Sequence, residues 1–436
     1  MKPMNVGLLG IGTVGQATYH VLNRNQEEIQ RRAGRNIHIS MVADLDVERA
    51  KSLVGADCVV VSDARAVIAN PDIDIVVELI GGYGIALELV MSAIESGKHV
   101  VTANKALLAL HGTEIFEAAH RKGVMVAFEA SVAGGIPIIK ALREGLTANR
   151  IEWIAGIING TTNFILSQMR EKNWSFKQAL EMAQSLGYAE ADPTFDIEGI
   201  DAAHKASIMA AIAFGIRMPF KSAYVEGITQ LQFQDIRFAE QLGYRIKLLG
   251  IAKQTQDGIE LRIHPCLVPA KSIIANVEGA MNAVMVQADA VGITLYYGKG
   301  AGGEPTASAV IADLVDITRL HTADPLNRVP HLAFQPQGMR DISLLPIEQV
   351  KTGFYLRLGV ADQAGVLANV TGLLAEHEIS IDAMLQQPSH SNEGRSELII
   401  LTHHCMESDM NDAISKIQAL PTVIDPIIRI RKEELV

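Results

Sequence analysis

A glycine-rich stretch near the start of the chain constrains its fold more than any other feature. Gly10, Gly12 and Gly15 follow the apolar run Asn5–Leu9, which predicts a strand, and open Val14–Arg24, which has helical spacing. In such a strand, turn and helix, the three glycines permit a tight turn, close approach of a pyrophosphate, and close packing of helix against strand. The pattern predicts a dinucleotide at the helix N-terminus, where free N–H groups and the helix dipole attract phosphate. The alternative is a tight turn that binds nothing.

Asp44 directly follows the next expected strand, Ile37–Ala43. A carboxylate there commonly holds a ribose hydroxyl and disfavours a 2′-phosphate, although Arg49 and Lys51 could offset its charge. The alternative is that Asp44 caps a helix that begins near Val47. The cofactor contacts expected from these two segments are Gly10, Gly12, Thr13, Val14, Gly15 and Asp44.

The pattern along the 436 residues predicts an α/β protein with several domains, because one hydrophobic core rarely serves such a length. Through residue 133, short β-rich runs alternate with amphipathic stretches, which predicts a doubly wound parallel sheet. Residues 134–320 mix helical and β-rich patterns and predict an α+β domain, whose last helix (307–318) returns to the first domain. Residues 321–350 contain four prolines and are expected to form a linker. Residues 351–436 then predict a small module of strands and helices.

Composition excludes several classes of function. The net charge of −11 argues against nucleic acid as a partner, because phosphate binding depends on Lys and Arg. The three cysteines, Cys58, Cys266 and Cys405, are far apart in the sequence, which excludes a disulfide scaffold or a cysteine-based zinc site. The chain has neither a signal-peptide core nor an apolar stretch of the ~20 residues that cross a membrane. We therefore expect a cytoplasmic protein without a membrane partner.

Lys105 lies in the stretch Thr102–Ala106, directly after an expected strand of the first domain. Doubly wound folds bind their ligands at the carboxyl ends of the strands. We therefore expect Lys105 near the nicotinamide edge of a cofactor cleft. The alternative is an ordinary solvated surface lysine.

The densest polar cluster, Gly187–Asp196, is followed by Asp201 and Lys205 on an expected helix. Their spacing of four residues puts the two side chains on one helix face, where such pairs are usually surface ion pairs worth ~0.5 kcal/mol or less. Against that alternative, Ala206–Phe214 is almost wholly apolar and predicts a buried helix. A buried lysine has an easily shifted pKa and can serve as a proton donor.

Taken together, motifs spread along the whole chain resemble homoserine dehydrogenase. They are the glycine turn, residues 102–105, 129–137 and 159–163, and the cluster 187–205. The resemblance implies reversible NAD(P)H-dependent reduction of L-aspartate 4-semialdehyde to L-homoserine, on the route to threonine, methionine and isoleucine.

The resemblance also implies roles for individual residues. Lys205 is expected to donate and accept the proton, with Lys105 beside cofactor and substrate, since hydride transfer to an aldehyde needs a group that protonates the emerging alkoxide. The expected substrate ligands are Glu190, Asp201, Asn159 and Thr161. Gly187 and Gly302 join the expected cofactor contacts.

A monovalent cation, usually sodium, is a further feature of the family. The matching positions here are Glu129, Val132, Gly134 and Ile136. Oxygen ligands from a glycine-rich turn suit a hard cation. The resemblance implies a structural cation without a part in the chemistry.

The closing module resembles an ACT domain, a ligand-sensing βαββαβ fold, through 354–360, 362–367 and the following helix to Glu376. The resemblance implies an amino-acid effector site at Gly365, Val366 and Leu367, and feedback inhibition by threonine. The alternative is that the module only dimerises. The family also implies a homodimer through the second domain, or a homotetramer through the closing module.

One departure from the family concerns cofactor choice. An arginine often precedes the residue that corresponds to Asp44, whereas Ala43 stands here, which argues against a strict NADP preference. The alternative functions are an oxidoreductase for another small oxo-acid and a non-catalytic dinucleotide sensor with an amino-acid-binding tail. Both are disfavoured because the lysines and the carboxylates occur together.

Overall fold

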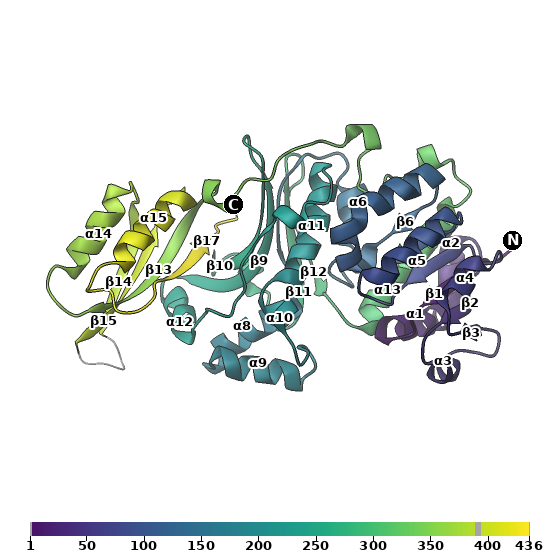
Figure 1. The fold of residues 1–436 in the computed structure, drawn as a ribbon, viewed down its shortest axis with the longest axis horizontal. Helices are drawn as coiled ribbons and strands as arrows, with labels where there is room; N and C mark the ends of the chain where they lie inside the picture. Colours follow the sequence, from purple (N-terminus) through teal and green to yellow (C-terminus); the bar gives the residue numbers. More distant parts are fainter. Residues whose placement is uncertain (1, 389–393, 436) are drawn as a thin grey trace. The chain divides into compact units, whose positions relative to one another are not determined.

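The computed structural model describes residues 2–388 and 394–435, which form two compact units (Figure 1). The first unit comprises Met1–Ile158, Asp201–Lys221 and Met281–Ile342, and the second comprises Asn159–Ile200, Ser222–Ala280 and Ser343–Val436. Within the described ranges, no helix has the length and hydropathy needed to cross a membrane.

A six-stranded parallel sheet forms the first part of unit one, with strand order β3-β2-β1-β4-β5-β6. The strands are β1 (Met4–Leu9), β2 (Ile37–Ala43), β3 (Val59–Val61), β4 (Ile75–Glu78), β5 (His99–Thr102) and β6 (Val126–Ala127). The order reverses beside β1, which is where doubly wound sheets bind nucleotides. The predicted Rossmann-type sheet is thereby confirmed.

Helices cover this sheet and complete its core. They are α1 (Thr13–Arg24), α2 (Gln26–Ala33), α3 (Val47–Leu53), α4 (Ala64–Ala69), α5 (Gly84–Glu95), α6 (Lys105–Lys122) and α13 (Gly303–Leu320). Although α13 is remote in sequence, its side chains Ala307, Val310 and Leu314 share one buried cluster with Val6 and Leu8 of β1. Apolar residues three and four apart give α13 this core-facing stripe.

Unit one also contains three antiparallel strands and a buried helix. The strands are β7 (Ile151–Ile157), β11 (Met281–Ala288) and β12 (Gly292–Lys299), with β11 between the other two. In α11 (Ile200–Phe214), every residue from Asp201 onward is buried. A helix that is apolar nearly all round must lie in the interior, so its few polar side chains are buried with it.

Unit two begins with helices and a long hairpin. The helices are α8 (Gly160–Lys172), α9 (Phe176–Ser185), α10 (Thr194–Ile197) and α12 (Phe233–Gln241). The hairpin joins β9 (Tyr244–Gln254) to β10 (Ile259–Pro269), and the short β8 (Tyr224–Val225) pairs with β10.

The closing module of unit two has the predicted βαββαβ order with one additional two-residue strand, β16, so this part of the fold prediction is confirmed. Its elements are β13 (Lys351–Ala361), α14 (Val366–Glu376), β14 (Ile381–Pro388), β15 (Arg395–Thr402), β16 (Cys405–Met406), α15 (Glu407–Gln418) and β17 (Ile428–Lys432). The sheet order is β17-β13-β15-β14, and α14 and α15 cover one face of it (Figure 1). Parallel pairing of β17 with β10 continues the sheet into the rest of unit two.

The expected linker, residues 321–350, is not a free connection: its first part, through Ile342, belongs to unit one and is hydrogen-bonded to it. Three short 3-10 helices stand in it, in keeping with prolines that cannot donate to a regular ladder. The Val126 amide donates to His331 Nε2 at 3.1 Å, and Arg328 donates to the Gly123 carbonyl at 2.8 Å. The segment is therefore held against the end of α6 and β6.

Candidate functional site

The glycine turn has the geometry that each predicted role requires. Gly10 has φ +90°, and a Cβ there would lie 2.9 Å from the Leu79 carbonyl oxygen. A Cβ on Gly15 would lie 2.2 Å from the Gly10 carbonyl oxygen, so only glycine lets helix and strand pack this closely. A Cβ on Gly12 would meet nothing within 4 Å, which leaves its backbone open to a ligand.

Two helix N-termini meet beside this turn. α1 begins at Thr13 and α13 begins at Gly303, and neither has a side-chain cap. A Cβ on Gly303 would lie 3.2 Å from Ala17 Cβ and 3.3 Å from the Thr13 carbonyl oxygen, so the two helix starts are adjacent. Gly302, with φ +117°, makes the turn into α13. Uncapped N–H groups from two helices suit a pyrophosphate.

Asp44 is tied to the turn and does not cap the following helix. Its carboxylate accepts from the Ile11 amide at 2.8 Å and from the Asp46 amide at 3.0 Å. The N-cap of α3 is Asp46, which accepts from the Arg49 amide, so the alternative that Asp44 is the cap is wrong. Each carboxylate oxygen retains capacity for a further hydrogen bond, such as one from a ribose hydroxyl.

A polar network at the carboxyl ends of β4 and β5 fixes the start of α6. Glu78 is fully buried; it accepts from Thr102 Oγ1 at 2.6 Å and from the Ile80 amide at 2.9 Å. Asn104 caps α6 by accepting from the Leu107 amide at 3.0 Å. The position of Lys105, the first residue of α6, follows from this network. Sequence analysis did not identify Glu78 as a functional residue. The feature that could have identified it is a carboxylate at the end of an otherwise apolar strand.

Lys105, Asp201 and Lys205 come together in unit one. Asp201 Oδ1 lies 2.9 Å from Lys105 Nζ, and Asp201 Oδ2 lies 2.7 Å from Lys205 Nζ, which also donates to the Ile158 carbonyl at 2.8 Å. The exposed side-chain fractions are 5% for Asp201, 11% for Lys205 and 34% for Lys105. The alternative of a surface ion pair between Asp201 and Lys205 is therefore wrong.

His204 borders this cluster without adding charge. Burial, together with Lys105 and Lys205, lowers its pKa to about 4 against the opposing effect of Asp201. The imidazole is thus neutral near pH 7, and its ring packs on Phe220 at 4.3 Å between centroids. The pairing of two lysines with one carboxylate places positive charge here, which suits an oxygen that becomes negative during a reaction.

Four other predicted site residues lie at one end of α8 in unit two. Asn159 caps the helix, accepting from the Thr162 amide at 2.8 Å, and donates to Asp196 Oδ1 at 2.7 Å. Thr161 Oγ1 donates to the Tyr188 carbonyl at 2.7 Å. These contacts attach the loop that carries Gly187, with φ +74°, and the exposed Glu190.

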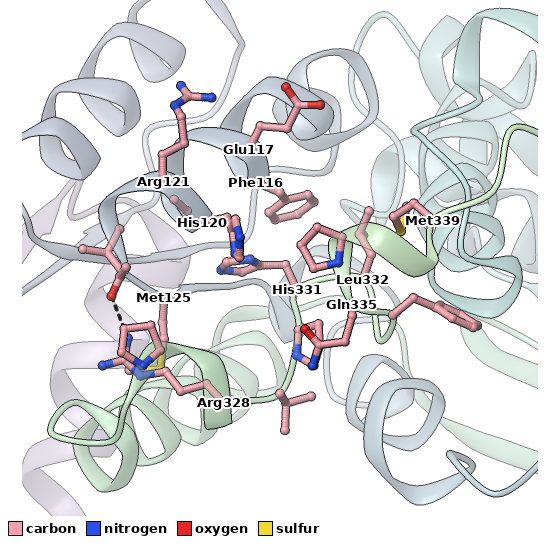
Figure 2. A pocket seen from close by; sticks show the side chains of 18 of the residues that line it. Phe116, Glu117, His120, Arg121, Met125, Arg328, His331, Leu332, Gln335 and Met339 are labelled. Carbon is pink, nitrogen blue, oxygen red and sulfur yellow. Dashed lines mark hydrogen bonds between the residues drawn. The ribbon is translucent and has the colours of Figure 1, made fainter.

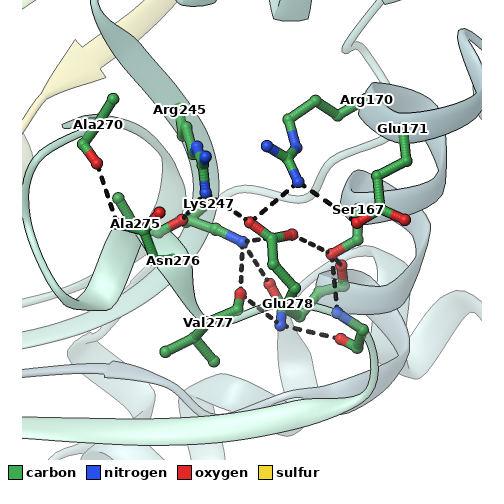
Figure 3. A network of polar contacts seen from close by, with 12 residues as sticks. Ser167, Arg170, Glu171, Arg245, Lys247, Ala270, Ala275, Asn276, Val277 and Glu278 are labelled. Carbon is green, nitrogen blue, oxygen red and sulfur yellow. Dashed lines mark hydrogen bonds and ion pairs between the residues drawn. The ribbon is translucent and has the colours of Figure 1, made fainter.

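A second buried lysine, which the sequence did not single out, holds the body of α8 (Figure 3). Lys247 on β9 is 2% exposed and donates to Asn163 Oδ1 at 3.1 Å and to the Val277 carbonyl at 2.6 Å. Its ammonium lies 3.4 Å from the carboxylate of Glu278, which also accepts from Ser167 Oγ at 2.8 Å. Burial lowers the pKa of Lys247 to about 8, although Glu278 opposes the shift.

The turn predicted to bind a cation is buried in unit one. Glu129 accepts from the Ile139 amide at 2.9 Å and the Lys140 amide at 2.8 Å, and its own amide donates to Asp313 at 2.8 Å. Burial raises the pKa of both carboxyl groups, and for Asp313 the neighbouring Glu129 adds to the shift. Ala133 has φ +55°, which turns the backbone sharply. Main-chain oxygens are ligands that a hard cation accepts, whereas the Glu129 side chain already anchors the next helix.

The predicted effector turn opens α14 in the closing module. Gly365 is its N-cap, with φ +93°. A cavity of about 210 Å³ is lined by Gly365, Val366 and Leu367 together with Gln386 and Leu398. Its size suits a small amino acid.

The chain matches known proteins along its whole length. Residues 10–129 match the NAD-binding domain of homoserine dehydrogenase, 137–315 match homoserine dehydrogenase, and 354–422 match the ACT domain. A homoserine dehydrogenase from Pseudomonas aeruginosa is 58% identical over 435 residues, with 100% of each chain covered. The chain belongs to the homoserine dehydrogenase family.

Solved homoserine dehydrogenases share the fold. The enzyme from Thiobacillus denitrificans superimposes with a TM-score of 0.96 at 62% identity, covering 100% of this chain and 99% of that chain. A hyperthermophilic archaeal homoserine dehydrogenase, solved in complex with NADPH, gives a TM-score of 0.63 at 26% identity, covering 74% of this chain and 99% of that chain.

As a homoserine dehydrogenase, the chain is an NAD(P)-dependent oxidoreductase of amino-acid biosynthesis that interconverts L-aspartate 4-semialdehyde and L-homoserine. It takes a nicotinamide cofactor and carries an ACT domain, a module for small-molecule ligands. The predictions of family, fold class and enzyme activity are confirmed.

Proposed function

We propose that Lys205 is the proton donor and acceptor of this homoserine dehydrogenase. The main support is that the buried ammonium group of Lys205 pairs with one carboxylate oxygen of Asp201, while Lys105 pairs with the other. The bound nicotinamide supplies the hydride when the aldehyde is reduced. Lys205 stabilises the alkoxide that emerges and protonates it, and in the reverse direction its amine takes the hydroxyl proton. Asp201 holds both lysines in place.

The substrate contacts follow the same proposal. The carboxylates of Glu190 and Asp201 suit the ammonium group of an amino-acid substrate, and Asn159 and Thr161 form the floor of the substrate pocket. The attachment of the Glu190 loop to α8 through Thr161 supports a common role for these residues.

Cofactor choice is the next part of the proposal. We infer that NADP is not the exclusive cofactor, because Asp44 carries a negative charge beside the turn and Ala43 replaces the expected arginine. The proposed contacts are Gly10, Gly12, Thr13, Val14, Gly15, Asp44, Lys105, Gly187 and Gly302. Comparable kcat/KM with NAD and NADP is expected; turnover with NADP alone would refute the inference.

A monovalent cation is proposed at the turn of Glu129, Val132, Gly134 and Ile136, with a structural role. The proposal is supported by the sharp turn of the backbone at Ala133, and by the burial of the residues around it, whose main-chain oxygens could bind the ion. Thermal unfolding in sodium chloride should be shifted upward relative to choline chloride at equal ionic strength. Equal midpoints in the two salts would exclude the site.

Regulation and assembly complete the proposal. Threonine is proposed to inhibit through Gly365, Val366 and Leu367, supported by the cavity at that turn. The proposed assembly is a homodimer or homotetramer, testable by sedimentation. A cytoplasmic location stays a prediction.

The main experiment is a spectrophotometric assay of homoserine oxidation with NAD and with NADP, each repeated with threonine. Turnover with both cofactors, reduced by threonine, is expected. Folded protein without turnover would refute the activity, whereas turnover insensitive to threonine would refute only its regulation.

A further inference from the structure

A cavity of about 370 Å³ lies in unit one and shares no lining residue with the lysine cluster or the glycine turn (Figure 2). Its walls are the C-terminal half of α6, the segment after α11, and residues 325–339. The volume falls within the ~300–1,000 Å³ typical of small-molecule sites. The established activity assigns no ligand to it.

The interior of the cavity is mostly apolar and aromatic. The Phe116 ring stacks on the His331 imidazole at 5.3 Å between centroids and 15° between planes, and Leu332 and Met339 add aliphatic surface. Phe334 also lines the cavity and remains 38% exposed. Flat rings and aliphatic side chains of this kind favour an occupant with an apolar, planar body.

His331 supplies a polar group without a charge. Burial lowers its pKa to about 3, and its Nε2 atom accepts from the Val126 amide at 3.1 Å. The proton of the neutral ring therefore lies on Nδ1, which is a donor.

Positive charge gathers at the same cavity, in a chain whose net charge is −11. Arg121 and Arg217 line it and are exposed, and within the described part of the chain neither forms an ion pair or a side-chain hydrogen bond. Arg328 lines the cavity as well, but its guanidinium donates to three backbone carbonyls, so it stabilises the cavity wall and is not available to a ligand in the same way. Glu117 is the single carboxylate among the described lining residues.

We propose that this cavity binds a small organic anion with an aromatic or aliphatic body. The apolar walls would take the body, and Arg121 and Arg217 would pair with a carboxylate or sulfonate at the mouth, where a guanidinium can bind such a group in a bidentate manner. A cationic or sugar-like ligand fits neither the charge nor the walls.

The site is held rigidly enough to be preformed. The Met218 amide donates to Thr113 Oγ1 at 3.3 Å, and the Arg340 amide donates to the Gly215 carbonyl at 2.7 Å. A Cβ on Gly215, which has φ +62°, would lie 2.9 Å from the Phe334 ring, so the segment seats closely on the end of α11. A preformed cavity spares the ligand the entropic cost of ordering these segments.

The test uses 8-anilinonaphthalene-1-sulfonate, a fluorescent aromatic anion, with the full chain and NADP at saturation so that the cofactor cleft is closed to the probe. We expect saturable binding that an aromatic carboxylate such as indole-3-acetate displaces. The double variant Arg121→Gln/Arg217→Gln should bind the probe at least tenfold more weakly. The matched control Lys172→Gln/Lys177→Gln, which removes two exposed positive charges in unit two, should leave the affinity unchanged.

Dehydrogenase turnover and sedimentation of each variant complete the test. Met339→Trp, which fills the cavity, should abolish probe binding while turnover stays near wild type. Equal probe affinity in the arginine variant and the lysine control would overturn the proposal. A change of oligomeric state in the arginine variant would also overturn it, because the arginines would then serve contacts between copies of the chain.

Discussion

Lys205 in unit one and Lys247 in unit two are buried lysines that have much in common and are assigned different roles. Measured over the whole residue, Lys205 on α11 is 9% exposed and Lys247 on β9 is 2% exposed. Each ammonium donates to a backbone carbonyl and lies beside a carboxylate, Asp201 or Glu278. Burial next to a carboxylate therefore does not by itself identify a catalytic lysine.

The partners of the two carboxylates differ. Glu278 also binds Arg245 at 2.9 Å and Arg170 at 3.2 Å, and the cavity beside this network has only about 10 Å³. Asp201 instead shares its charge with Lys105, whose side chain is 34% exposed. Both networks reach the surface in part: 26% of the Glu278 side chain and 24% of Arg245 are exposed, against 34% of Lys105. The Glu278 network differs because three cations engage its carboxylate and almost no cavity lies beside it. We expect a functional site to combine burial with a group that a ligand can reach.

The largest expected effect comes from Lys205→Arg. Arginine keeps the positive charge beside Asp201 but does not release its proton near neutral pH, so kcat should fall by ~10²–10⁴, the usual contribution of a general acid–base group. Steady-state rates of homoserine oxidation measure this loss. A kcat within threefold of wild type would mean that only the charge matters.

Lys247→Ala should affect stability instead. Without the ammonium, Asn163 Oδ1 and the Val277 carbonyl each lose a buried donor, which costs about 2 kcal/mol of unfolding free energy. Urea unfolding, with exposed Lys177→Ala as the control, measures the change. Unaltered stability would show that water replaces the ammonium.

Lys105→Met removes the accessible partner of Asp201. Because Lys105 is partly exposed and its ion pair with Asp201 is accessible to solvent, we expect roughly a tenfold rise in substrate KM, smaller than the effect at Lys205. Arg245→Met, which removes the corresponding partner of Glu278, should leave KM unchanged. Equal KM changes in both variants would contradict the claim that only the Asp201 network contributes to substrate binding.

The smallest effect concerns pH. The pKa of Lys247 falls from 10.5 to about 8 on folding, so the unfolded chain binds more protons between these values. Unfolding free energy should therefore gain a rising contribution from pH 8 to about 10.5. Lys247→Met should lack that contribution when its urea midpoints are compared with wild type across this range. Parallel pH profiles would contradict the lowered pKa.

Local sequence patterns were sufficient for several parts of the fold and the site. The strands Ile37–Ala43 and His99–Thr102 have the predicted bounds, because parallel strands buried on both faces are continuous apolar runs. The buried pairing of Asp201 with Lys205 followed from their spacing and from the apolar residues after them.

Contacts between distant residues could not be predicted from such patterns. Lys247 meets Asn163 across 84 positions, and the Val126 amide meets His331 across 205. Prolines indicated irregular structure in 321–350, but nothing local showed that this segment closes a cavity. These features depend on which surfaces the fold brings together.

The most direct test of the contrast between the two lysines is turnover by Lys205→Ala and Lys247→Ala, assayed in parallel at a temperature where both are folded by circular dichroism. We predict that Lys205→Ala loses at least two orders of magnitude in kcat, whereas Lys247→Ala stays within about threefold of wild type. Near-normal kcat in Lys205→Ala, or an equal loss in both variants, would contradict the assignment.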